Sequence, residues 1–339
     1  MDSYTNFAYV YDTFMDQEPY EEWADRVCSL LDLYGIPRKA DGDPDREVFK
    51  DTGGDACRDA DRDASAGENA VSDRRDFTGE NAFLGADCPA ETDLPAQEDR
   101  FEEEKNIVVD LGCGTGKLTE ILASRGYDMI GVDLSEDMLS IALQRRIRNG
   151  SNTLYTLQDM RDFELYGAAG AMVSVGDSIN YLLQESDLTA MFRCVERALL
   201  PGGVFVFDFK TIHLYRDVIG NRTIAEDDES CAFIWDNYYD PETCVNEYDL
   251  RIFVSKEILE ENRGDNPEPD GDGQPPEEDG ALFRRFHEIH YQRGYEPEQL
   301  RHAAETAGLS WVLAQDAETG GEITPDTERA MAVVRRKDR

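Results

Sequence analysis

The order of apolar and polar residues along the chain predicts strands and helices in alternation. Short apolar runs have the length of buried strands, and they cover residues 107–110, 128–133, 153–158, 171–175 and 203–209. Apolar residues recur at helical spacing over residues 18–34, 116–125, 136–148, 187–199 and 296–309. Two more strand-like runs follow at 310–317 and 329–337. Strands that alternate with helices predict a parallel, doubly wound α/β sheet.

Between residues 222 and 292 the pattern changes to segments that look like antiparallel strands. They cover residues 231–240, 244–256 and 282–293. We interpret them as a small sheet laid over one end of the main sheet.

Two polar stretches interrupt these patterns. Residues 38–105 hold 21 acidic and 10 basic side chains, and residues 257–280 hold 10 acidic side chains and one Arg. Neither stretch can bury enough apolar area to offset the entropy lost on ordering, so we expect both to be disordered insertions. They serve either as solvated spacers or as an interaction tail or acidic lid.

The stretch VVDLGCGTG, residues 108–116, joins a predicted buried strand to a glycine-rich turn of the kind that binds nucleotides. The dinucleotide pattern GxGxxG would need glycine at 117, where Lys117 stands. Asp110, at the strand end, would oppose a pyrophosphate and suits a ligand whose near end is cationic. S-adenosylmethionine (SAM) carries an ammonium and a sulfonium and no phosphate, so it meets this requirement.

Acidic residues also follow the next two predicted strands. Asp133 ends the second strand, where a carboxylate can accept hydrogen bonds from both ribose hydroxyls. Asp159 and Met160 follow the third, where the acid can accept from an adenine amino group while Met160 packs on the ring. The alternatives are a cap or turn role for Asp110 and a turn for Asp159.

The chain resembles class I SAM-dependent methyltransferases in its motifs VVDLGCGTGKLTEILA, GVDLSEDMLSIA, LQDMRDF, GDSINYLL and ALLPGGVFVFDF. Its segments YTNFAYVYDTFM, YEEWAD and FHEIHYQRGY resemble the small-molecule branch, which includes sugar-amine N-methyltransferases and uncharacterised bacterial members. The resemblance implies a Rossmann-like, seven-stranded mixed sheet with an antiparallel last strand and a small antiparallel lid inserted after strand five. Members of that branch usually lack the two long insertions.

The same resemblance implies a set of SAM contacts, to which Cys113 and Leu134 are added because they stand inside the same motifs. The set comprises Asp110, Gly112, Cys113, Gly114, Asp133, Leu134, Met138, Asp159, Met160 and Gly176. Cys113 is interpreted as a small filler and not as a nucleophile, because no base stands beside it in the sequence.

In the family that this chain resembles, the N-terminal segment folds over the cofactor. We therefore expect Tyr11 and Tyr20 to contact SAM and Tyr4 to contact the substrate, with core or helix packing as the alternative.

Candidate catalytic residues follow the fourth strand and occupy the last strand of the predicted lid. Asn180 and Tyr181 stand at the carboxyl edge, where open α/β sheets bind ligands, and we expect them to orient the substrate. His290 is the candidate base, and the alternative for a single His is a structural role. Arg293 is expected to tie the lid to the main sheet.

The amino-acid composition of the chain limits the classes of partner and cofactor that we expect it to bind. The 339 residues carry a formal net charge of −39, which disfavours nucleic acid and anionic membranes. The seven cysteines form no CxxC and the four His form no metal-ligand cluster, so we expect a reduced, cytoplasmic protein without a metal. No apolar run is long enough to span a membrane and no signal peptide is evident. A monomer or a homodimer is expected.

The expected organisation has five parts: an N-terminal helical segment (1–37), an acidic insertion (38–105), the SAM-binding core (106–221), a lid (222–292) with an acidic loop at 257–280, and the end of the core (293–339). The predicted function is transfer of a methyl group from SAM to nitrogen or oxygen of a small molecule. The alternatives are a non-catalytic SAM-binding module that recruits a protein through its acidic insertions, and a protein methyltransferase.

Overall fold

The computed structural model describes residues 19–38, 104–227, 231–255 and 282–338. The predicted contacts of Tyr4 and Tyr11 lie outside these residues. The predicted acidic loop 257–280 also lies outside the described residues. The same holds for the insertion 38–105, apart from residues 38, 104 and 105.

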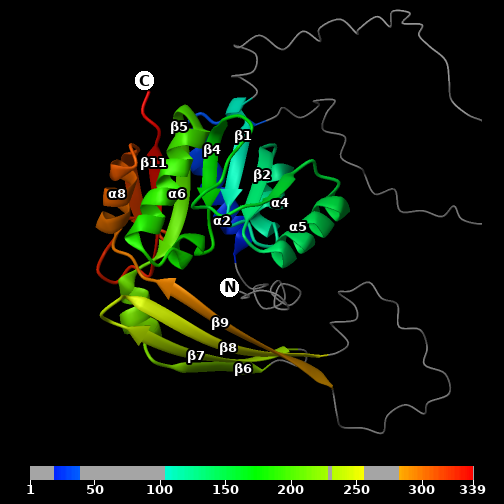
Figure 1. Cartoon of the computed structure of the whole chain (residues 1–339), viewed down its shortest axis with the longest axis vertical. Coiled ribbons are helices and arrows are strands. Elements are labelled where there is room, and N and C mark those ends of the chain that lie inside the picture. The colour runs from blue at the N-terminus through cyan, green and yellow to red at the C-terminus, as the bar shows by residue number, and fades with distance from the viewer. Residues whose placement is uncertain (1–18, 39–103, 228–230, 256–281, 339) are drawn as a thin grey trace, which may run out of the picture.

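The core is a seven-stranded mixed sheet, as predicted (Figure 1). Its strands are β1 (Ile107–Leu111), β2 (Asp128–Asp133), β3 (Leu154–Leu157), β4 (Ala169–Ser174), β5 (Leu199–Lys210), β10 (Ser310–Asp316) and β11 (Arg329–Arg335). The strand order is β10-β11-β5-β4-β1-β2-β3. β11 runs antiparallel to both of its neighbours, and the pairs among β1 to β5 are parallel.

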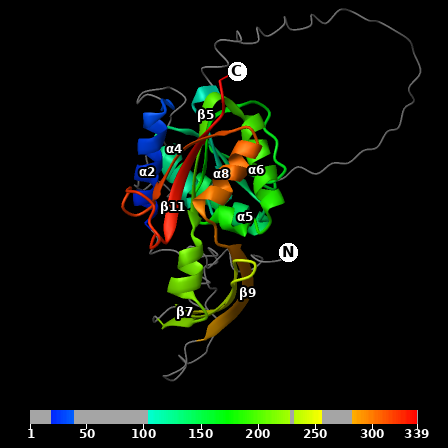
Figure 2. The same ribbon diagram turned by 90° about the vertical axis from the view of Figure 1, so that its left-hand side faces the viewer.

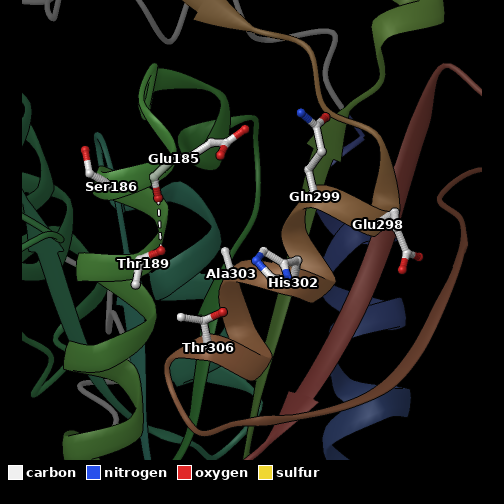
Figure 3. A pocket seen from close by; sticks show the side chains of 8 residues that line it. All are labelled: Glu185, Ser186, Thr189, Glu298, Gln299, His302, Ala303 and Thr306. Carbon is white, nitrogen blue, oxygen red and sulfur yellow. Dashed lines mark hydrogen bonds between the residues drawn. The ribbon is translucent and has the colours of Figure 1, made fainter.

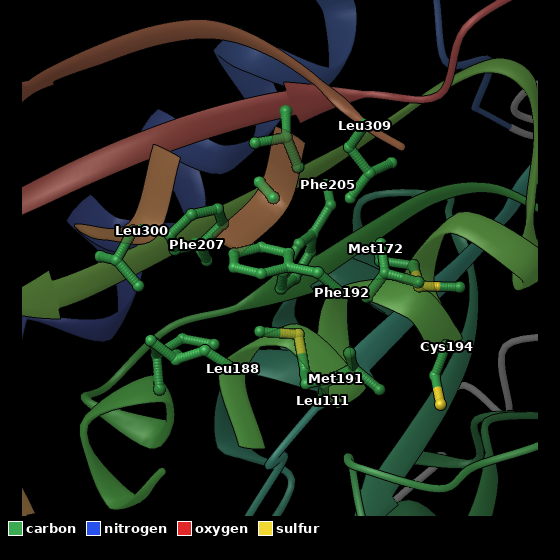
Figure 4. Packing of buried hydrophobic residues seen from close by; sticks show 14 of the residues in the cluster. Leu111, Met172, Leu188, Met191, Phe192, Cys194, Phe205, Phe207, Leu300 and Leu309 are labelled. Carbon is green, nitrogen blue, oxygen red and sulfur yellow. The ribbon is translucent and has the colours of Figure 1, made fainter. Parts of the chain in front are cut away.

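Helices cover both faces of this sheet, which is what its almost wholly apolar strands require (Figure 2). They are α2 (Tyr20–Leu33), α4 (Lys117–Ser124), α5 (Glu136–Asn149), α6 (Glu185–Ala198) and α8 (Pro297–Thr306). α2 and α4 pack on one face, and α6 and α8 pack on the other. Under α6, the Phe192 ring meets Phe205 and Phe207 of β5 with centroid separations of 6.2 and 5.5 Å (Figure 4).

A second, four-stranded antiparallel sheet lies between β5 and α8 in sequence, also as predicted. It consists of β6 (Thr223–Asp227), β7 (Cys231–Asp240), β8 (Val245–Ser255) and β9 (Phe283–Arg293). The sequence analysis missed β6, because its residues TIAED are mostly exposed and carry no apolar alternation. It also missed the π-helical turn η2 (Leu214–Ile219), which leads from the core toward this sheet.

Figure 1 shows the antiparallel sheet below the ends toward which β1 and β5 point. Along β8 and β9 buried residues alternate with less buried ones, so one face of this sheet is covered and the other meets solvent. We call the face that carries Tyr248, Leu250, Glu288, His290 and Gln292 the inner face. The carboxyl edge of the core sheet and the inner face therefore oppose each other.

No helix among the described residues is long and apolar enough to cross a membrane.

Candidate active site

The glycine-rich loop leaves β1 through three left-handed backbone conformations, with φ of 74° at Gly112, 55° at Gly114 and 73° at Gly116. Glycine adopts this region without strain. A β-carbon on Gly112 would fall 2.5 Å from Ser178 Oγ and 3.2 Å from Met160 Cε, whereas one on Gly114 would meet nothing within 4 Å. The loop is therefore packed tightly at its start and open at Gly114, where a ligand can approach the backbone.

Asp110 is buried beneath this loop, with 1% of its surface exposed. Burial raises the pKa of the Asp110 carboxyl group to about 7, and the negative charge of Asp133 contributes to this shift. Thr119 Oγ1 donates a hydrogen bond to the carboxylate at 2.6 Å, which opposes the shift. A carboxylate that is costly to ionise gains most from a cationic ligand, because the ligand replaces the lost hydration. This environment fits the cationic end of SAM.

Asp133 ends β2 next to the same loop. Its carboxylate accepts hydrogen bonds from the backbone N–H groups of Gly114 and Ser135, both at 2.8 Å. Burial raises the pKa of Asp133, and these N–H groups counteract the shift. Both predicted acids thus lie at neighbouring strand ends and beside the loop. Their contacts with SAM remain predictions.

The sequence analysis did not identify the residues that support this loop from behind. Glu120 of α4 is buried and accepts hydrogen bonds from the hydroxyls of Tyr155 and Ser151, each at 2.9 Å. A β-carbon on Gly116 would fall only 2.4 Å from the Tyr155 hydroxyl oxygen. Glycine at 116 is therefore favoured both by its left-handed φ and by a tyrosine 39 positions later, and no local motif signals the contact with that tyrosine.

The remaining predicted cofactor residues have different surroundings. Asp159 is engaged by Arg161, whose Nη2 lies 2.5 Å from Oδ2; this lowers the pKa of Asp159, so an adenine amino group would share these oxygens with Arg161. Met138 is buried, whereas the Leu134 side chain is 59% exposed. Cys113 is buried, and burial raises the pKa of its thiol, which agrees with its interpretation as a filler.

Tyr20 begins α2 and faces the start of α4. Its ring packs edge-on against Trp23 at 5.1 Å, and Lys117 Nζ lies 4.7 Å from the Tyr20 ring centroid. Since Lys117 directly follows Gly116, α2 brings Tyr20 to the end of the glycine loop. Its predicted contact with SAM remains a prediction.

A network of buried charges holds the turn after β4. Asp208 accepts hydrogen bonds from the N–H groups of Gly176 and Asp177, at 3.1 and 3.2 Å. Arg329 Nη1 lies 2.6 Å from Asp208 and 2.7 Å from Asp177, and Lys210 Nζ lies 2.5 Å from Asp177. Asp177 has a φ of 69°, which is rare for a residue with a side chain, and the network holds it there.

The four charges balance in sign but their pKa values shift differently. Burial raises the pKa of Asp208, with Arg329 opposing it. Burial would also raise the pKa of Asp177, but Arg329 and Lys210 together lower it below its usual range. No local pattern in the sequence indicates the three partners of Asp177, which lie 31 to 152 positions later in the chain.

Asn180 and Tyr181 follow this turn and differ in their contacts. Asn180 is fully buried; its amide donates to the carbonyls of Lys210 and Arg293, at 3.0 and 2.8 Å, and accepts from the Lys210 N–H. It joins β5 to the end of β9, which favours a positioning role over the predicted contact with substrate. The Tyr181 hydroxyl lies 3.4 Å from His290 Nδ1.

His290 is buried on the inner face of the antiparallel sheet, and burial lowers its pKa to about 4. Its ring is therefore neutral at physiological pH. Arg293, at the end of the same strand, donates to the Leu183 carbonyl at 3.0 Å and so ties β9 to the core as predicted.

A separate depression of about 440 Å³ lies between α6 and α8 (Figure 3). Its lining includes Glu185, Thr189, Glu298 and His302. None of the residues that line it is among the predicted site residues. The predicted site therefore lies at the carboxyl edge and not at this depression.

Fold and site together define a Rossmann-like protein with a buried acid, Asp110, and a half-buried acid, Asp133, at neighbouring strand ends, which is the class of the SAM-dependent methyltransferases. A family model described as a methyltransferase domain matches residues 108–203. The putative methyltransferase YqeM of Bacillus subtilis is 30% identical over 227 residues, which are 67% of this chain and 82% of YqeM. The chain therefore belongs to the methyltransferase family, is an enzyme and uses SAM.

Two further comparisons concern the fold of the chain and the branch of methyltransferases that it resembles. A crystal structure of a SAM-dependent methyltransferase from Clostridium acetobutylicum aligns with a TM-score of 0.66 at 20% identity, covering 98% of this chain and 99% of that one, which shows the shared fold. The dTDP-3-amino-3,6-dideoxy-alpha-D-glucopyranose N,N-dimethyltransferase of Streptomyces fradiae is 34% identical over 154 residues, 43% of this chain and 57% of the relative.

Proposed function

We propose that the enzyme methylates an amine nitrogen of a small-molecule acceptor. The observation that carries this proposal is the burial of His290, which lowers its pKa to about 4 beside the Tyr181 hydroxyl. A base is most effective when its pKa lies near the working pH, so such an imidazole is a poor base for a hydroxyl acceptor. A neutral amine needs no strong base, and an imidazole that stays neutral can still orient it by accepting a hydrogen bond.

The chain's own residues supply the binding of the cofactor. Asp133 would accept from the ribose hydroxyls, Asp110 would face the cationic end, and Met160 would pack against the adenine ring. Bound SAM supplies an already activated methyl group, so the protein contributes mainly proximity and alignment. The open backbone at Gly114 and the charge network behind Gly176 would fix the position from which that methyl group leaves.

A relative supports the choice of nitrogen. The Streptomyces fradiae protein is named as an N,N-dimethyltransferase of an amino sugar nucleotide, and this chain covers 57% of it. The neutral His290 points to the same acceptor atom by an independent physical argument.

The test measures transfer of labelled methyl from SAM to a panel of small amines and alcohols, with mass spectrometry to place the methyl group. His290→Ala and Tyr181→Phe should lower turnover by less than about tenfold and leave the Kd for SAM unchanged, because orientation is worth less than proton transfer. A loss of about 10²–10⁴ for His290→Ala, together with an O-methylated product, would refute the amine proposal. Glu247→Gln, on the opposite face of the antiparallel sheet, is the control.

A further inference from the structure

The inner face of the antiparallel sheet meets the core at three points along its polar part. Tyr181 contacts His290, the Tyr215 hydroxyl donates to Gln292 at 2.8 Å, and Lys210 Nζ lies 6.0 Å from the ring centroid of Tyr248. These contacts hold the row that contains Tyr248 and His290 against the ends of β4 and β5. The next row outward on the same face is therefore adjacent to the carboxyl edge.

That next row is formed by Trp235, Leu250 and Glu288, because Trp235 pairs with Leu250 and Leu250 pairs with Glu288. Further out, Ile252 and Phe286 belong to the same buried apolar cluster as Met138 at the start of α5. Leu250 belongs to this cluster too and Trp235 packs against it, so the row of Glu288 adjoins both the part of the sheet that meets β4 and β5 and the start of α5. The glycine loop after β1 lies between these same two parts of the core.

Among the residues that the structure describes, two polar groups of this row lack the partners that buried polar groups normally have. Trp235 Nε1 is buried with no hydrogen-bond partner among the described residues. Glu288 is 8% exposed; burial raises the pKa of its carboxyl group, and only the charge of His287 opposes this shift. An unpaired buried carboxylate and an unpaired indole N–H are costly unless a ligand or water completes them.

The outer face of the same sheet shows the contrast. There Asp236 pairs with Arg251 at 2.7 Å, and Asp249 pairs with Arg251 and with His287, both at 2.8 Å. Asp236 and Asp249 on the outer face are thus matched with cations, whereas among the described residues no cation pairs with Glu288 on the inner face. Glu288 is the one of these acids that would gain most from a cation supplied from outside the chain.

We propose that Glu288 binds a cationic group of the methyl acceptor, whose nucleophilic amine lies beside His290. The Trp235 indole N–H can only donate a hydrogen bond, so it would serve an uncharged acceptor atom of the same molecule. This inference rests on the proposed function and adds to it a charge requirement for the acceptor. Residues two apart on one strand lie about 6.5–7 Å apart on the same face. The acceptor class is therefore a small molecule with a protonated amine and a second, reacting amine at roughly that spacing.

The experiment uses the full chain saturated with S-adenosylhomocysteine and titrates it by calorimetry with putrescine, a diamine, and with n-butylamine, its monoamine counterpart. Putrescine should bind more tightly than n-butylamine. Glu288→Gln should weaken putrescine binding about 10- to 100-fold, the range for a hydrogen bond to a charged group. Trp235→Phe should weaken it less. Glu247→Gln removes the same charge from the outer face and should change nothing.

The outcomes separate this inference from the proposed function. Unaltered affinity for S-adenosylhomocysteine in Glu288→Gln shows that the variant is folded. Putrescine binding that is absent, equal to that of n-butylamine, or unaffected by Glu288→Gln overturns the inference and leaves the methyltransferase proposal intact. Failure of the wild-type chain to bind S-adenosylhomocysteine would instead count against the proposed cofactor site.

Discussion

The two sheets of this molecule handle polar residues in opposite ways. In the core sheet all six residues of β4 are buried, and the acids Asp110, Asp133 and Asp208 stand at or near the ends of their strands. In the antiparallel sheet, polar residues run along the strands, and the alternation of β9 places Glu288 and His290 on its covered face. A doubly covered sheet has room for ligands only at its edge, whereas a singly covered sheet can offer a whole face.

The difference also appears in how charge is matched. At the core edge, Asp177, Asp208, Lys210 and Arg329 are partly or fully buried and balance one another. On the outer face of the antiparallel sheet, Arg251 pairs with two acids in solvent. Buried pairs are costly to break and exposed pairs contribute little, so equivalent substitutions should have unequal effects.

The largest effect is expected from Arg329→Met. It leaves Asp208 and Asp177 buried with Lys210 as the remaining cation of the network, and removing one partner of a buried pair costs about 3–5 kcal/mol. Urea denaturation should show this loss of unfolding free energy. Arg301→Met, which removes an exposed helix pair with Glu298, should leave the midpoint unchanged. Equal behaviour of the two variants would show that the network contributes no stability.

A smaller effect is expected at the strand end of β2. Asp133→Ala should weaken SAM by about 1.5–3 kcal/mol, the range for a hydrogen bond to a charged group. Part of this loss would come from the Gly114 N–H, which donates to Asp133. Calorimetry should be compared with Glu136→Ala, an exposed acid in the first turn of α5. An unchanged SAM affinity in folded Asp133→Ala would place the ribose elsewhere.

The pH dependence of SAM binding tests Asp110. Its pKa is raised to about 7, so in the free protein the carboxyl group holds a proton as the pH falls below 7. A cationic ligand favours the ionised form, and SAM affinity should therefore rise about tenfold from pH 6 to pH 8. The same raised pKa affects the free energy of unfolding of the free protein. This free energy should fall as the pH rises toward 7, because the buried Asp110 carboxyl group then loses its proton and a buried charge is costly. Asp110→Asn should abolish this pH dependence; a slope that persists in the variant would assign the titration to another group.

The smallest effect is expected on the outer face. Arg251→Gln breaks exposed pairs with Asp236 and Asp249, and solvent compensates both acids. Its denaturation midpoint and its SAM affinity should match those of the wild type. A clear loss of stability would show that this face is covered in solution, for example by a second copy of the chain.

Local sequence signals were sufficient for most elements and for part of the site. The apolar runs predicted all seven core strands, most readily the central ones such as β1 and β4, because a strand buried on both faces is apolar along its length. The glycine loop, Asp110 and Asp133 were found because backbone conformation and strand ends leave local marks. The exposed strand β6 left none, and β6 was missed.

The sequence by itself therefore determined the α/β order and the family, and it predicted the edge of the sheet at which the cofactor binds. Only the tertiary structure decided which distant residues surround the predicted site: Arg329 reaches Asp208 across 121 positions, and Tyr155 packs against Gly116. It also decided which face of β9 is turned inward. Alternation with period two shows that Glu288 and His290 share a face, but whether that face meets the core or solvent depends on packing against residues far away in the chain.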